Sequence, residues 1–144
     1  MKKIGKICSF LREIRGLACN MPTHFIFIKR GEIMVIHLDG DIFDNVKHGT
    51  KNVEVRVNDE KRRKIKVGDK ITFFKRPDDI ENIDAIVENL SYYKNFKDLV
   101  KDYTIEELYS KGYSKEEFLY LLKRFYSDDE IDKYGTVAIK FKIT

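Results

Sequence analysis

Three ionisable side chains lie close together in the segment KNVEVR, at Lys51, Glu54 and Arg56. A lysine ammonium supplies a compact positive charge for a phosphate or a carbonyl oxygen. An arginine guanidinium adds a planar fork of donors that fits phosphate or the acceptor edge of a base. A glutamate accepts hydrogen bonds from an exocyclic amine, as acidic side chains do with cytosine. These residue types are together suited to binding a nucleotide or a nucleic acid.

The segment that carries them, residues 51–57, is predicted to be a half-buried β-strand. Three valines alternate with polar residues, which is typical of a strand with one buried face. Side chains two residues apart on a strand lie roughly 6.5–7 Å apart, so Glu54 and Arg56 either act on one ligand or pair with each other. A solvated ion pair on an exposed face, worth ~0–1 kcal/mol, is the alternative interpretation. The polar face carries Asn52, Glu54, Arg56 and Asn58.

Length and composition indicate one globular domain. The chain has 144 residues, of which 36% are charged and 12% aromatic, a composition unlike that of disordered proteins. It contains no apolar run of about 18 residues that would predict a membrane-spanning helix. A single pair of cysteines, Cys8 and Cys19, does not indicate a disulfide framework, and a reducing cytoplasm is the simpler context. We therefore expect a cytoplasmic protein with no membrane partner.

The charge is distributed unevenly along the chain. Residues 44–76 hold 11 basic and five acidic residues, whereas residues 77–144 hold 10 basic and 15 acidic ones. A positive patch around the strand 51–57 is the expected electrostatic footprint of a phosphate-bearing partner. Lys61 and Arg62, in the run KRRK, are candidates for contacts with backbone phosphates. A solvated lysine-rich loop is the alternative interpretation of that run.

Hydrophobic periodicity, together with capping and turn residues, predicts the remaining elements. Ser114 and Glu117 have the spacing of a capping box, and Gly135 is predicted to end the last helix. Clustered strands with a helical insert predict an α+β domain built on a small mixed β-barrel. We expect strands at 33–38, 51–57, 70–76, 82–93 and 136–143, and helices at 39–47, within 96–123 and at 127–135.

The first 33 residues are predicted to be a basic N-terminal extension, separate from a domain at 34–144. They carry seven basic and two acidic residues, and their apolar residues have a helix-like spacing up to Pro22. The segment KRGEIM, 29–34, has the form expected when a purine-rich ribosome-binding sequence and a start codon are translated in frame. We therefore hypothesise that the natural chain starts at Met34.

Residues 34–144 resemble the ASCH domain, a family within the PUA-like superfamily of small β-barrels. The resemblance rests on the pattern Gly-x-Lys-x-x-Glu-x-Arg from Gly49 to Arg56, on NDEKRRKIKVGDKITF after it, and on the tail FYSDDEIDKYGTVAIKFKI. It implies a cleft beside the barrel and an association with RNA or a modified nucleotide. The ligand-binding residues expected on this basis are Lys51, Glu54, Arg56, Asn58, Lys61 and Arg62.

One branch of the ASCH family removes the acetyl group from acetylcytidine, and the resemblance makes a small amidohydrolase an alternative function. In that branch the strand reads Lys-x-x-Thr-x-Arg, with Lys and Thr in catalytic roles. Lys51 and Arg56 match this pattern, but Glu54 replaces the threonine. If the chain is an enzyme, Lys51 and Glu54 are the candidate catalytic residues, activating a water molecule. A regulatory protein-interaction module is the second alternative.

Other residues that could carry chemistry are the aromatic side chains and the histidines. Tyr92 and Tyr93 are candidates for stacking on a base, whereas Phe74 is expected to pack in the core. The three histidines have no metal-ligand spacing among themselves or with the cysteines, so we expect no metal site and no cofactor. His37, on an apolar strand, is expected to be a core histidine with a hydrogen-bond partner.

Overall fold

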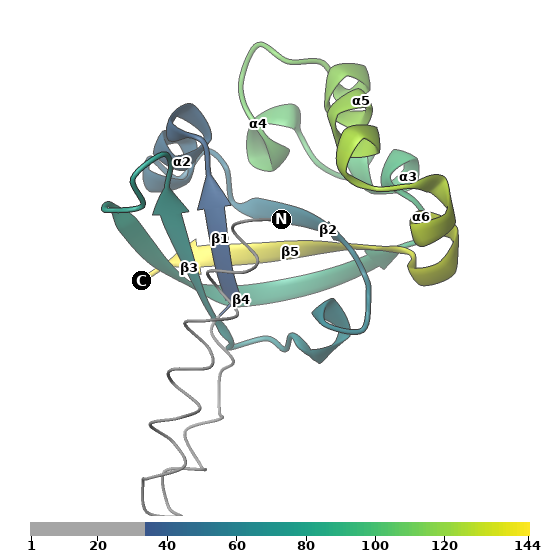
Figure 1. Cartoon of the computed structure of the whole chain (residues 1–144), viewed down its shortest axis with the longest axis horizontal. Helices are drawn as coiled ribbons and strands as arrows, with labels where there is room; N and C mark the ends of the chain where they lie inside the picture. The colour runs from purple at the N-terminus through teal and green to yellow at the C-terminus, as the bar shows by residue number, and fades with distance from the viewer. Residues whose placement is uncertain (1–33) are drawn as a thin grey trace, which may run out of the picture. The chain divides into compact units, whose positions relative to one another are not determined.

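The computed structural model describes residues 34–144, so the predicted extension 1–33 lies outside the described residues. Figure 1 shows the arrangement of the elements. The strands are β1 (Met34–Leu38), β2 (Val53–Val57), β3 (Lys70–Lys75), β4 (Asn82–Tyr93) and β5 (Thr136–Ile143). The helices are α2 (Gly40–Lys47), the 3-10 turn η2 (Arg62–Lys64), α3 (Phe96–Val100), α4 (Ile105–Leu108), α5 (Lys115–Phe125) and α6 (Asp128–Tyr134).

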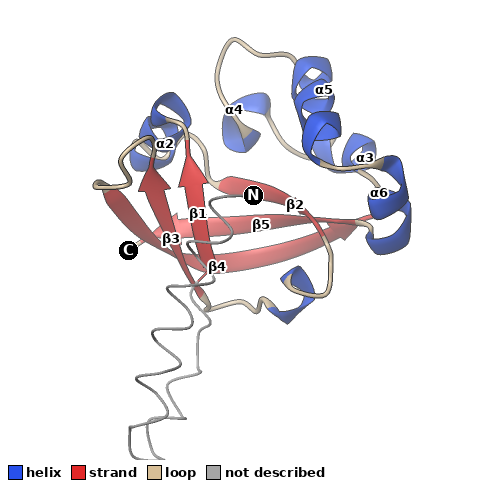
Figure 2. Ribbon diagram, viewed as in Figure 1, coloured by secondary structure: helices blue, strands red, loops and turns tan. Residues whose placement is uncertain are grey.

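The five strands form one curled sheet in the order β1-β3-β4-β5-β2. β1 pairs with β3 in parallel, and the other three pairings are antiparallel. The sheet curls into a half-barrel, with helices α3 to α6 grouped on one side, as Figure 2 shows. This architecture confirms the predicted α+β class. In the described part of the chain, no helix is long and apolar enough to cross a membrane.

Two hydrophobic clusters lie on opposite faces of β2 and β5. Val53, Val55 and Val57 pack against the helical insert, together with apolar side chains from α3 to α6. Val137 and Ile139 of β5 face the other way, into the cluster that holds Phe43 and Val46 of α2 and Phe73 of β3. Both faces of this part of the sheet therefore carry an apolar cluster, and Glu54 and Arg56 share the face of Val137 and Ile139.

The helix boundaries follow from capping side chains. The predicted capping box is confirmed, because the Ser114 hydroxyl accepts from the Glu117 amide and the Glu117 carboxylate accepts from the Ser114 amide. Ser127 caps α6, which ends at Gly135 as predicted. At α2, Asp39 occupies the N-cap position, but its side chain accepts no capping hydrogen bond.

Candidate functional site

Lys51 lies in the connection between α2 and β2, and it is only 3% exposed. Its ammonium nitrogen is 2.6 Å from the Val53 carbonyl oxygen and 2.7 Å from the Leu108 carbonyl oxygen, at the end of α4. The Glu54 carboxylate lies 3.4 Å away. Two of the three donors of the lysine ammonium therefore bind main-chain carbonyls, and the same nitrogen forms an ion pair with Glu54. Lys51 therefore joins the start of β2 to the helical insert.

Glu54 and Arg56 continue this network along β2. The Arg56 Nε donates to Glu54 Oε1 at 3.0 Å. Glu54 is 7% exposed, whereas about a quarter of the Arg56 side chain, 24%, reaches solvent. The interpretation of a solvated ion pair is therefore wrong for Glu54. Register explains the burial, because Glu54 and Arg56 lie opposite the buried residues Ile139 and Val137 of β5.

The electrostatics favour a charged Glu54. Burial alone would raise the pKa of Glu54, but the positive charges of Lys51 and Arg56 outweigh it and hold the pKa below its ordinary value. Burial lowers the pKa of Lys51, and the single carboxylate that it shares with Arg56 offsets this only in part. The three side chains thus form a buried network in which one carboxylate serves two cations.

This network limits the chemistry that Lys51 and Glu54 can perform. Glu54 occupies the position of the threonine in the deacetylating branch, so it brings no hydroxyl nucleophile to this position. Its lowered pKa makes it a weak general base, and its oxygens already accept from both cations. In this arrangement the network holds β2 in place. The network could activate a water molecule only if Glu54 gave up its contact with Lys51 or with Arg56.

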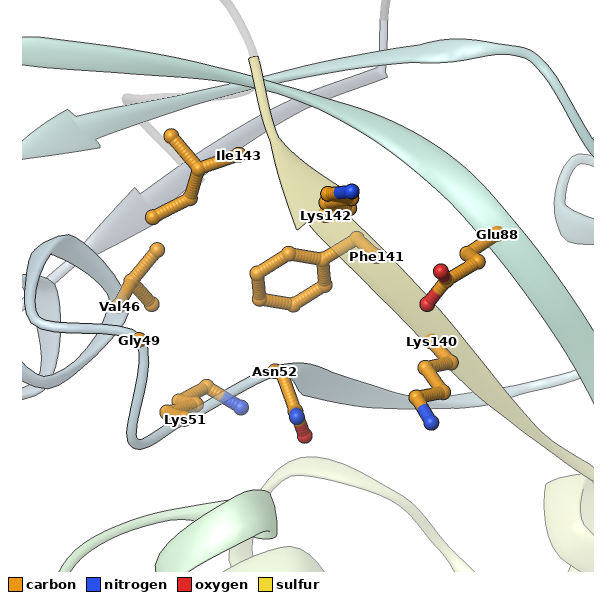
Figure 3. A pocket seen from close by; sticks show the side chains of 9 residues that line it. All are labelled: Val46, Gly49, Lys51, Asn52, Glu88, Lys140, Phe141, Lys142 and Ile143. Carbon is orange, nitrogen blue, oxygen red and sulfur yellow. The ribbon is translucent and has the colours of Figure 1, made fainter.

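A shallow pocket of about 410 Å³ opens beside Lys51, as shown in Figure 3. Phe141 and Ile143 of β5 and Val46 of α2 supply its apolar wall. Lys140 and Lys142 are exposed at the pocket and make no ion pair with any residue of 34–144. The lining residues are Val46, Gly49, Lys51, Asn52, Glu88, Lys140, Phe141, Lys142 and Ile143.

The other predicted binding residues, Asn58, Lys61 and Arg62, lie past the opposite end of β2. Lys51 precedes β2 and Asn58 follows it, so Asn58 lies roughly 20 Å from Lys51 along the strand. The backbone N–H of Asn58 donates to the Gly135 carbonyl at 2.9 Å, and the Arg62 side chain pairs with Asp59 at 3.3 Å. Lys61 is exposed. The structure therefore divides the six predicted residues into a buried network and a second group beyond the far end of β2, in which Lys61 is exposed and Asn58 and Arg62 are half-buried.

Sequence reasoning missed two residues that lie beside this second group, Arg63 and Tyr134. The Arg63 Nε donates to the Asn58 carbonyl at 3.0 Å, and its guanidinium lies 5.6 Å from the centre of the Tyr134 ring. Lys133 lies over the same ring at 5.0 Å. The run KRRK was a signal for Arg63, but its contact with Tyr134 spans 71 positions and leaves no local pattern. Lys140 and Lys142 alternate with buried residues in TVAIKFKI, a signal that could have identified them.

The aromatic candidates differ in their surroundings. Tyr92 is 58% exposed, whereas the Tyr93 hydroxyl donates to Asp102 at 2.8 Å. The core expectation for Phe74 is wrong, because its half-buried ring stacks on His37 at 5.6 Å while Phe73 fills the core. His37 Nδ1 lies 3.1 Å from Asp79 Oδ1, but within residues 34–144 neither atom makes a hydrogen bond and the ring is only half-buried, so the expectation of a core histidine with a hydrogen-bond partner is wrong. Within residues 34–144 no cluster of three or more side chains could hold a metal ion.

Comparison with known proteins supports the same fold. The family model described as "ASCH domain" matches residues 36–144. The solved structure of the hypothetical protein PH0355 is 27% identical, has a TM-score of 0.65, and covers 78% of this chain and 100% of its own. Protein PF0455 from Pyrococcus furiosus is 28% identical, has a TM-score of 0.62, and covers 78% of this chain and 97% of its own. The search of curated proteins gave no significant match. These similarities confirm the PUA-like fold.

Proposed function

The chain belongs to the ASCH domain family, and from this premise we propose that it binds single-stranded RNA through the basic segment that follows β2. The family supports an RNA-binding type of module in general. The finer assignment depends on where the cations of this chain are exposed.

One observation carries the proposal. Residues 61–66 hold five cations, and only Arg62 forms an ion pair within the described part of the chain. Lys61, Arg63, Lys64 and Lys66 are exposed to solvent. Exposed cations on one short segment are the groups that neutralise backbone phosphates and release their counterions. This segment is therefore a better candidate for phosphate contacts than the buried network around Lys51.

We assign different roles to the two groups of predicted binding residues. Asn58, Lys61 and Arg62 would contact the ligand, with Arg56 at the edge of the same surface. Lys51 and Glu54 would position β2, because their polar atoms are already satisfied within the protein. The pocket beside Lys51, with Lys140 and Lys142, would be a second contact for a longer strand or a site for a nucleotide.

The test is a binding assay with short single-stranded RNAs and with nucleotides, followed against salt concentration. Salt-dependent RNA binding that weakens in a Lys61→Gln/Lys64→Gln variant would support the proposal. Affinity that is unchanged by this double substitution would contradict it. The same incubations should include acetylcytidine, since release of acetate would instead support the amidohydrolase alternative.

A further inference from the structure

Tyr92 differs from the other aromatic side chains at the end of β4. It is 58% exposed, while the adjacent Tyr93 packs against the helical cluster and bonds to Asp102. A single exposed tyrosine is normal on a protein surface and needs no explanation by itself. The neighbours of Tyr92 are what give it significance.

Strand register places Tyr92 on the same face of the sheet as Arg56. In the ladder of β4 and β5, Tyr92 lies opposite Val137, and in the ladder of β2 and β5, Arg56 also lies opposite Val137. Directly opposed residues of antiparallel strands share a face, and neighbouring strands are about 4.8 Å apart. Arg56, Val137 and Tyr92 therefore form one row across three strands. Val137, in the middle of this row, is only 1% exposed and is therefore covered by other parts of the protein.

The basic segment leaves the sheet at this same end. Val57 and Tyr93 both lie opposite Thr136, and the Asn58 amide bonds to Gly135, the residue before it. Arg63 folds back onto the Asn58 carbonyl. In the view of Figure 1 the connection that follows β2 crosses β5 and β4. Tyr92 and Arg63 thus lie near the same end of the sheet.

We propose that Tyr92 is a stacking platform for one base of a single-stranded RNA, with the cations of residues 61–64 on the flanking phosphates. Sites for single strands combine a positive surface with an aromatic ring on which a base stacks. Stacking uses the face of the base and therefore tolerates any sequence. This inference rests on the proposed function and specifies how the ligand is held.

The test uses Tyr92→Ala and Tyr92→Phe with an RNA of about eight nucleotides that contains one 2-aminopurine. Loss of a stacked base should weaken binding by about 5- to 150-fold in Tyr92→Ala. Tyr92→Phe keeps a ring and should bind like the natural protein. The fluorescence of 2-aminopurine should be quenched by the natural protein and by Tyr92→Phe, and much less by Tyr92→Ala. Equal denaturation midpoints would show that the fold is intact.

Two results would overturn the inference, and they can be told apart. If Tyr92→Ala binds RNA as tightly as the natural protein while Lys61→Gln/Lys64→Gln binds weakly, stacking on Tyr92 is wrong and the proposed function stands. If the natural protein binds no RNA at all, the proposed function fails and the stacking site fails with it. An RNA with an abasic nucleotide in place of 2-aminopurine is the matched control, because it keeps the phosphates and lacks the base.

Discussion

The Lys51 ammonium donates to the Leu108 carbonyl at 2.7 Å and so joins two segments that are 57 residues apart in the sequence. The contact is reinforced by the backbone N–H of Asn52, which donates to the Glu107 carbonyl at 3.2 Å. Four-residue helices such as α4 have little stability of their own. The position of α4 against the sheet therefore depends on these contacts with the start of β2.

Replacing Lys51 by Met should destabilise the protein strongly. The substitution leaves Glu54 with one cation and leaves the Leu108 carbonyl without its donor, and breaking a buried ion pair costs about 3–5 kcal/mol. Chemical denaturation measures the effect. Lys140→Met is the matched control, because Lys140 is exposed, and its change should stay within about 0.5 kcal/mol. Equal stability of the two variants would contradict the structural role of Lys51.

Acid should destabilise the protein partly through Glu54. The pKa of Glu54 is lowered in the folded state by Lys51 and Arg56, so its contribution to stability is full above its ordinary pKa of 4.5. As the pH falls through 4.5 and on to the lower folded pKa, this contribution is lost. Urea titrations over this pH range should show a falling free energy of unfolding.

The Glu54→Gln variant isolates this effect. It should be less stable than the natural protein at neutral pH, and the difference should shrink as the pH is lowered. Asp84→Asn is the comparison variant. Hydrogen bonds with Lys70 and Thr72 also lower the pKa of Asp84, but its side chain, unlike that of Glu54, is 40% exposed. A stability difference between Glu54→Gln and the natural protein that does not vary with pH would show that Glu54 is not the titrating group.

Local sequence signals were sufficient for most elements of the fold. The predicted bounds of β4 and β5 match the structure because each strand has turn residues before it and a regular pattern within it. The parallel pairing of β1 with β3 could not be predicted, since it joins strands separated by α2 and β2. Long-range pairing of this kind is decided by packing of whole faces and not by any local pattern.

The sequence identifies the residues of the candidate site, but it does not show whether these residues are buried. Alternation placed Glu54 and Arg56 on one face of β2, as observed, but it assigned that face to solvent or to a cleft. The face is buried because β5 presents Val137 and Ile139 beside it and because α4 covers Lys51. Both partners come from the last two thirds of the chain. A strand pattern cannot show which segments cover it.

Gly135 should tolerate alanine less well than Gly49. Both glycines have positive φ angles, 71° and 81°, which L-residues adopt at a cost of about 1–2 kcal/mol. A Cβ at Gly135 would also lie 2.9 Å from the Tyr93 carbonyl oxygen, whereas a Cβ at Gly49 would meet nothing within 4 Å. Denaturation midpoints of the two alanine variants measure the difference. Equal midpoints would show that the main chain near Tyr93 moves easily.

The salt dependence of RNA binding should identify the cations that contact phosphates. For single strands, the slope of log K against log salt changes by about 0.7 for each phosphate contact. Lys61→Gln/Lys64→Gln should therefore reduce the magnitude of the slope by about 1.4 if both lysines make such contacts. Lys111→Gln/Lys123→Gln removes the same charge from exposed positions beside and on α5 and should leave the slope unchanged. If both double variants lower the slope equally, the attraction is a property of net charge and not of the segment after β2.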